Sequence, residues 1–126
     1  MRYLLDTNVL IYMLSAPDEI SPEAKRIVQT EEHLFASFAS LWEIAIKQGL
    51  GKLNIGLNIP GIEEQCEIRG IQMLPLSSGA IERIKTLPNI HRDPFDRMLI
   101  AQAIEDSLTI VTRDRIIPQY QVPTIW

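Results

Sequence analysis

The sequence has almost no cysteine. Cys66 is the only cysteine among 126 residues, so the chain cannot form an internal disulfide bond. A lone cysteine is most often a small hydrophobic residue of a protein core. We therefore expect Cys66 to be buried and not to act as a catalytic thiol.

The sequence also lacks a long apolar segment. The strongly apolar stretch at residues 9–14 is far too short to span a bilayer. Asp6 interrupts what would be the apolar part of a signal peptide, and no small-residue cleavage site follows it. These features predict a soluble, cytoplasmic protein with no membrane association. With 46% hydrophobic residues, a chain of this length suits a single packed domain over residues 1–126.

An excess of positive charge is absent as well, since the formal net charge is -4. This value argues against a protein that holds nucleic acid by bulk electrostatics alone. It does not exclude a nuclease, because a cluster of carboxylates that binds divalent cations makes the chain itself more acidic. Basic residues do lie near the later acids of the sequence, namely Arg92, Arg97, Arg113 and Arg115.

What the sequence does contain is an alternation of short apolar runs and helical segments, without repeats or linkers. Ser21 before Pro22 is typical of a helix start, and Gly49 and Gly70 are plausible helix stops. Because the apolar runs are continuous, they indicate strands buried on both faces, in a parallel sheet with helices on each side. We expect strands at residues 3–5, 34–36, 71–76, 108–111 and 122–125, and helices at residues 9–15, from 22 onward, 39–48, 60–69, 78–86 and 94–106.

Two acidic residues directly follow predicted strands. Asp6 ends the first apolar run, and Asp114 comes after the run at residues 108–111. In a parallel sheet the polar site gathers at the carboxyl ends of the strands. We therefore expect both carboxylates to project from the same edge of the sheet.

Two further acids lie where an apolar residue would be expected. Asp96 shares a helical stripe with Leu99, Ile100 and Ala103, so its side chain should point inward over the sheet edge. Glu43 is a single acid in an almost wholly apolar helical segment, where an ionised carboxylate is costly unless something pairs with it.

Each acid also has a purely structural interpretation. Asp6 could cap the first helix, Asp96 could favour the positive end of its own helix, and Asp114 could be a turn residue. Glu43 could pair with Lys47 one helical turn later. These interpretations do not explain why four acids meet at one edge, where like charges about 4 Å apart repel by roughly 4 kcal/mol. A divalent cation resolves that repulsion, and oxygen ligands favour Mg²⁺ or Mn²⁺.

Polar neighbours of these acids need separate treatment. Asp93 precedes Pro94, so we expect it to cap the helix, although it remains a possible additional acid of the site. His33 and His91 lack the spacing of metal ligands, and we expect surface positions for both, although His91 could touch substrate. The candidates for holding Asp6 or for contacting substrate and flanking phosphates are Thr7, Asn8, Lys47, Arg97, Thr112 and Arg113.

Four segments together resemble the PIN domain, and most closely the VapC-type toxins of prokaryotic toxin–antitoxin pairs. The segments are Leu4-Leu5-Asp6-Thr7-Asn8, Ser40-Leu41-Trp42-Glu43-Ile44-Ala45-Ile46-Lys47, His91-Arg92-Asp93-Pro94-Phe95-Asp96-Arg97-Met98-Leu99-Ile100-Ala101-Gln102-Ala103, and Thr109 to Asp114. The ordered set is specific, whereas any one segment alone is weak. The likeness runs over nearly the whole chain.

The resemblance implies a three-layer α/β/α sandwich with a short central parallel sheet of 4–5 strands. It implies Mg²⁺- or Mn²⁺-dependent cleavage of RNA by an endoribonuclease. The first three acids of the family match Asp6, Glu43 and Asp96, and its less constant fourth acid matches Asp114. The resemblance also implies a homodimer and a small antitoxin protein as partners.

Three other classes of protein start from a similar pattern. A phosphatase of the haloacid-dehalogenase kind needs a second aspartate two residues after the first, where this chain has Asn8. A receiver domain needs an aspartate after its third strand, where this chain has Ser77 and Ser78. A catalytically inactive PIN-like module that only binds RNA or a partner remains an alternative, although the chain retains all four acids.

Overall fold

The computed structural model describes residues 1–126, and a five-stranded sheet forms its centre. The strand order is β3-β2-β1-β4-β5, and every neighbouring pair is parallel. This confirms the parallel sheet that the sequence predicts. The strands are β1 (Tyr3–Leu5), β2 (Leu34–Ser37), β3 (Ile71–Leu74), β4 (Thr109–Val111) and β5 (Thr124–Ile125).

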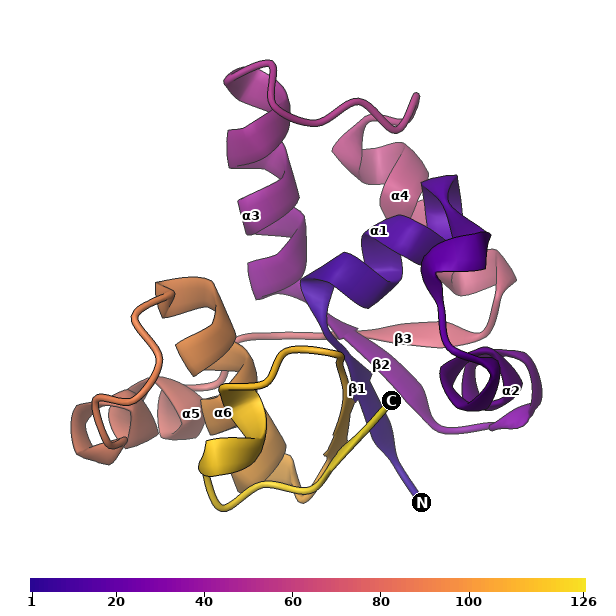
Figure 1. Cartoon of the computed structure of the whole chain (residues 1–126). Helices are drawn as coiled ribbons and strands as arrows, with labels where there is room; N and C mark the ends of the chain where they lie inside the picture. Colours follow the sequence, from indigo (N-terminus) through magenta and orange to yellow (C-terminus); the bar gives the residue numbers. More distant parts are fainter.

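Helices cover both faces of this sheet, which confirms the α/β/α arrangement (Figure 1). None of them combines the length and apolar character needed to cross a membrane. The α-helices are α1 (Thr7–Ser15), α2 (Pro22–Thr30), α3 (Phe38–Gly49), α4 (Ile59–Ile68), α5 (Ser78–Arg83) and α6 (Pro94–Asp106). Short 3₁₀ helices lie at η1 (Pro17–Glu19), η2 (Ile84–Thr86) and η3 (Ile117–Gln119).

Two apolar cores lie on opposite sides of the sheet. On β1, Tyr3 and Leu5 pack into the core beneath α1, α2, α3 and α4, whereas Leu4 packs into the core shared with α6 and η3. This alternation follows from the two-residue period of a strand. Cys66 belongs to the first core and is fully buried, as predicted.

Most predicted elements are present, with differences at their ends. Ser21 caps α2 by accepting from the backbone N–H of Ala24, and α6 has the predicted bounds. Helix α3 ends at Gly49, within one residue of the predicted stop. Leu50 caps it, and Gly51, with φ of 68°, takes the left-handed turn that follows. The segment expected as one helix over residues 78–86 is divided into α5 and η2.

The order of the strands decides where the polar site lies. The chain runs from β1 through β2 to β3 on one side, and then returns to place β4 and β5 on the other side of β1. In open parallel sheets, ligands bind beyond the carboxyl ends of the strands at the point where the order reverses, and here that point lies after β1 and β4. Asp6 follows β1 at this point, and Asp114 lies in the turn after β4.

Candidate metal centre

Asp6 is held at the end of β1 by the neighbouring strand. Its side chain is 4% exposed, and its Oδ2 accepts a hydrogen bond of 2.6 Å from the hydroxyl of Thr112. Although Asp6 precedes α1, it makes no side-chain capping bond there. Burial raises the pKa of Asp6, and the hydrogen bond from Thr112 only partly offsets this. The carboxylate is therefore costly to keep ionised without a cation.

Glu43 projects from the second turn of α3 into the same region. Lys47 donates to its Oε2 at 2.8 Å, so the predicted pair one helical turn apart does form. The other oxygen, Oε1, is buried and has no hydrogen-bond partner. A buried carboxylate oxygen without a partner is unfavourable, and ion pairing with Lys47 alone does not account for this residue.

Asp96 lies in the first turn of α6 with a side chain that is 13% exposed. Its pKa is raised from 3.8 to about 7, first by burial and then by the negative charges of Asp6 and Asp93. The charge of Glu43 adds to this effect. The inward orientation expected from its helical stripe is therefore present.

Asp114 makes more hydrogen bonds than any other of the four acids. Its Oδ1 accepts from the backbone N–H groups of Ile116 and Ile117, at 2.7 and 3.1 Å, so it does shape the turn after β4. Its Oδ2 lies 3.1 Å from Nε2 of His91. Burial alone would raise the pKa of Asp114, but the hydrogen bonds from His91 and from the two backbone groups outweigh burial and lower it.

His91 connects two of these acids. Its Nε2 lies 3.0 Å from Oδ2 of Asp96 as well as 3.1 Å from Oδ2 of Asp114. The three donor atoms all lie within 4.8 Å of one another, close enough to hold one metal ion. The expected surface position is wrong for His91, since its side chain is only 10% exposed.

The four carboxylates fit a divalent cation. The charges of Asp114 and Glu43 raise the pKa of Asp6, and those of Asp6 and Glu43 raise that of Asp96, so the negative charges of all four groups act on Asp6 or Asp96. The unpartnered Oε1 of Glu43 is an oxygen that a cation could satisfy. A donor set of carboxylate oxygens suits a hard divalent cation.

Asp93 takes the capping role that its position predicts. Its Oδ1 accepts from the backbone N–H groups of Phe95 and Asp96, at 2.8 and 3.4 Å, and Pro94 occupies the first helical position. The same carboxylate raises the pKa of Asp96, so it borders the acids while capping their helix.

The polar candidates divide by their contacts. Thr7 is buried and shares a hydrogen bond of 2.8 Å with Ser40, whereas Asn8 is exposed on α1. Thr112 is 3% exposed, with its hydroxyl engaged by Asp6. The guanidinium of Arg97 donates to backbone carbonyls of the loop before α6, including that of Pro88 at 2.8 Å.

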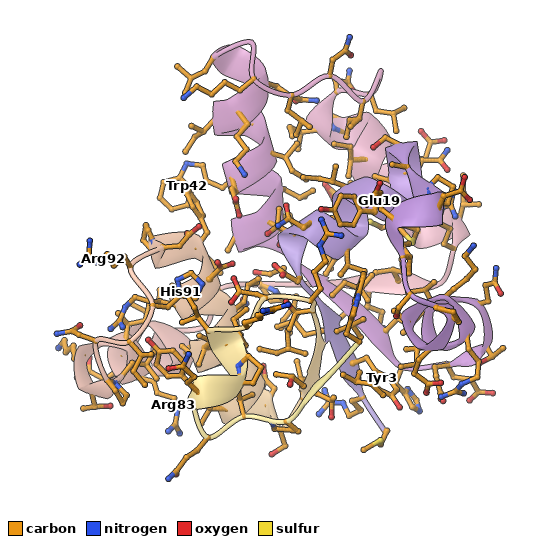
Figure 2. All side chains as sticks on the ribbon, viewed as in Figure 1. Tyr3, Glu19, Trp42, Arg83, His91 and Arg92 are labelled. Carbon is orange, nitrogen blue, oxygen red and sulfur yellow. The ribbon has the colours of Figure 1, made fainter.

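Arg113 extends away from the acids toward the other end of α1. It donates to the hydroxyl of Tyr12 at 2.7 Å and lies over that ring. At 3.5 Å it also reaches Glu19, which lies in η1 after the end of α1 and is well away from His91 in Figure 2. Of the basic candidates, Lys47 is therefore the one in direct contact with a site acid.

A comparison with known families supports the resemblance noted in the sequence. A family profile described as "PIN domain" matches residues 3–123, nearly the whole chain. The chain belongs to the PIN domain family. Its match includes all four acids described above.

Individual proteins show the same likeness. The PIN domain here is 24% identical to "Ribonuclease VapC22" of Mycobacterium tuberculosis, covering 98% of this chain and 97% of that one. Among solved structures, the VapBC2 complex of Rickettsia felis bound to a promoter DNA fragment matches with a TM-score of 0.72 at 15% identity, covering 99% of this chain and 98% of that chain. A DNA-bound VapBC of Salmonella typhimurium matches with a TM-score of 0.71 at 18% identity, covering 99% and 97%. The structural matches show that the fold is shared.

Sequence reasoning allowed His91 only a contact with substrate and did not single out Ser40, so it did not predict their contacts with Asp96, Asp114 and Thr7 in this PIN domain. A histidine near an acid-rich turn was visible, but nothing in its spacing shows that its ring turns inward. Ser40 lies on the first turn of α3, and its bond to Thr7 joins segments 33 residues apart. Such contacts leave no periodic signal.

Proposed function

We propose that this PIN domain is an endoribonuclease that hydrolyses RNA phosphodiester bonds with Mg²⁺ or Mn²⁺ as its cofactor. The observation that carries the proposal is the convergence of four carboxylates, from Asp6, Glu43, Asp96 and Asp114, at the switch point of the sheet, where the charges of the others raise the pKa values of Asp6 and Asp96. The name of the similar mycobacterial ribonuclease supports RNA as the substrate.

The residues have distinct tasks in this proposal. Asp6 and Asp96 would hold the principal cation, and Glu43 and Asp114 would complete its surroundings. When bound, the divalent cation would stabilise the negative charge that develops on the scissile phosphate. Oε1 of Glu43 has no partner in the protein, so it is available to take a proton from the attacking water.

Basic side chains beside the acids are suited to the flanking phosphates. Lys47 and the exposed Arg92 border a shallow pocket together with Glu43 and Phe95, between α3 and the start of α6. Arg92 points outward from this edge of the molecule (Figure 2). We assign phosphate contacts to Lys47 and Arg92, whereas Arg97 holds the loop before α6 by its backbone contacts.

Incubation of the purified protein with single-stranded RNA tests this function. We expect cleavage with Mg²⁺ or Mn²⁺ and none with EDTA. Asp6→Asn and Asp96→Asn should each abolish cleavage while keeping the fold, because both substitutions preserve side-chain size. Asp18→Asn is the matched control, since Asp18 is exposed in η1 and should not affect activity. Cleavage by Asp6→Asn at the wild-type rate would show that the assigned site is wrong.

We also propose that this ribonuclease is the toxin of a type II toxin–antitoxin pair and forms a homodimer. The titles of the similar solved structures describe VapBC and toxin–antitoxin complexes, which supports an antitoxin partner. Helix α3 exposes an apolar face suited to a protein partner, and Trp42 projects from it beside the start of α6 (Figure 2). The exposed residues of this face are Phe38, Trp42 and Ile46, and Leu50 is exposed directly after the end of the helix.

Expression in a bacterial host tests the toxin role, and light scattering tests the dimer. Induction of the wild-type chain should arrest growth, whereas induction of Asp6→Asn should not. Normal growth with the active enzyme at a verified level would contradict the toxin role. A monomeric mass at micromolar concentration in size-exclusion chromatography with light scattering would contradict the homodimer.

A further inference from the structure

The loop that carries His91 is anchored from two directions. The hydroxyl of Tyr120 accepts from the backbone N–H of His91 at 2.7 Å and from that of Ile90 at 3.2 Å, and it donates to the carbonyl of Pro88 at 2.9 Å. Arg97 donates to the same carbonyl from α6. Tyr120 is itself 5% exposed in the second apolar core. The backbone of His91 is therefore held against the core next to the acids.

The imidazole ring of His91 has a defined tautomer in this setting. The backbone N–H of Asp93 donates to its Nδ1 at 3.2 Å, so Nδ1 carries a lone pair and not a proton. The neutral ring then has its proton on Nε2. Both carboxylate oxygens near Nε2, on Asp96 and Asp114, can only accept when they are ionised.

This geometry makes His91 a bridge between α6 and the turn after β4. One N–H group points at two carboxylates of like charge, which come from segments 18 residues apart in the sequence. Without that donor, the two carboxylates would repel each other across the site. No other side chain donates a hydrogen bond to either of them.

We infer that His91 is a positioning residue of the proposed ribonuclease site, which holds Asp96 and Asp114 in place for the cation by donating to both and does not bind the cation itself. A histidine that binds a metal through Nε2 must carry its proton on Nδ1. Here that proton would face the N–H of Asp93, so two donors would oppose each other. The loop therefore favours the donor role over the ligand role.

Binding of Mn²⁺ to the full chain, followed by electron paramagnetic resonance of the free ion, tests this inference. His91→Ala should weaken binding about 10- to 100-fold, the usual effect of losing a group that orients metal ligands. His91→Gln should bind close to the wild type, because the glutamine amide can donate from the position of Nε2. His33→Ala is the matched control, since His33 is exposed before β2 and should leave binding unchanged.

Nuclear magnetic resonance of the imidazole nitrogens supplies a second measurement. The chain has only two histidines, so the His33→Ala variant assigns the signals of His91. We expect Nε2 of His91 to keep its proton before and after saturation with diamagnetic Mg²⁺. Loss of that proton on addition of Mg²⁺ would show that His91 is a ligand and would overturn the inference.

The outcomes separate this inference from the proposed function on which it rests. If His91→Ala binds Mn²⁺ like the wild type while Asp96→Asn does not, the positioning role is wrong and the metal-dependent site stands. A folded His91→Gln that binds as weakly as His91→Ala also overturns the positioning role. If the wild type binds no Mn²⁺ at millimolar concentration, the proposed metal-dependent function itself fails.

Discussion

At the scale of a single residue, the pKa of Asp96 depends strongly on the groups around it. Its pKa of about 7, against an ordinary value of 3.8, reflects burial first and the charges of Asp6 and Asp93 second. In the absence of a cation, the folded protein keeps a proton between about pH 4 and pH 7 that the unfolded chain releases. The stability that this proton contributes is present at low pH and is lost as the pH rises through about 7.

The first prediction concerns Asp96→Asn. Without metal, this variant should be more stable than the wild type at pH 8, by on the order of 2 kcal/mol. A rise of about three pKa units corresponds to about 4 kcal/mol at 1.4 kcal/mol per unit, and solvent screening at this partly exposed group roughly halves that value. At pH 4 the two proteins should be close in stability. Urea unfolding in EDTA at both values of pH measures the difference. An identical dependence on pH in both proteins would contradict the raised pKa of Asp96.

Thr112 is a second residue whose role depends on its surroundings. Its hydroxyl donates to Asp6 and accepts from the backbone N–H of Asp114 at 3.0 Å, so it serves the two acids that follow neighbouring strands. Thr112→Val keeps the side-chain shape but removes both bonds. We predict a loss of about 1–3 kcal/mol in the free energy of unfolding, because two buried polar groups lose a partner.

The same substitution should weaken Mn²⁺ binding about 10- to 100-fold, since Thr112 orients a proposed ligand. Isothermal titration measures this effect. Thr109→Val is the control, because Thr109 is buried at the start of β4, three residues before Thr112, and its hydroxyl does not contact the acids. Equal losses in both variants would mean that Thr112 acts through strand packing alone.

At the scale of elements, helix α6 directs the side chain of Asp96 inward and has Asp93 as its N-terminal cap. Asp93 caps the helix, Pro94 takes its first position, and Ser107, with φ of 56°, ends it in the left-handed conformation. Because these signals are local, the sequence predicts the bounds of α6 correctly. Helix α3 likewise ends at Gly49, as the glycine predicts, although it is Gly51, two residues later, that has the positive φ.

The third prediction separates the two possible roles of Asp93. Asp93→Ala should lower the free energy of unfolding by about 1 kcal/mol, the usual cost of losing a helix cap. Asp93→Asn should retain nearly full stability and metal-dependent RNA cleavage, because an asparagine oxygen can still accept from Phe95. Thermal unfolding and cleavage assays of both variants test this. If Asp93→Asn folds normally but loses Mn²⁺ binding, Asp93 is a ligand as well as a cap.

At the scale of the whole molecule, we expect the acids to link the stability of the fold to a cation. The site draws on β1, α3, α6 and the turn after β4, so only the native state brings its groups together. A ligand bound only by the native state stabilises it, by about 2.7 kcal/mol at a concentration 100 times its dissociation constant.

The fourth prediction follows for thermal unfolding. Saturating Mn²⁺ should raise the Tm by on the order of 10 °C for a domain of this size, and EDTA should reverse the change. Asp6→Asn should show a much smaller rise, whereas Asp18→Asn should behave like the wild type. Differential scanning calorimetry measures the shift. An unchanged Tm for the wild type would argue against a metal site anywhere in the molecule.

The sequence by itself determined the parallel direction of the strands, most of the helices and strands, and the four candidate acids. Continuous apolar runs at β1 and β4 indicate strands that are buried on both faces. An acid that follows such a strand therefore lies at the carboxyl edge of the sheet. Glu43 and Asp96 were visible because each interrupts an apolar helical pattern. Each of these signals depends only on residues that are close together in the sequence.

Only the tertiary structure decided how the acids are held. The bond from Thr112 to Asp6 spans 106 residues, and Tyr120 reaches the backbone of His91 across 29. The direction of the His91 ring depends on how the loop before α6 packs against η3, and no local pattern encodes that packing. A hydrogen bond between distant segments exists only once the core has placed both groups. For this reason the acids, the pair of Glu43 with Lys47 and the candidacy of Thr112 could be predicted from the sequence, whereas the roles of His91 and Tyr120 could not.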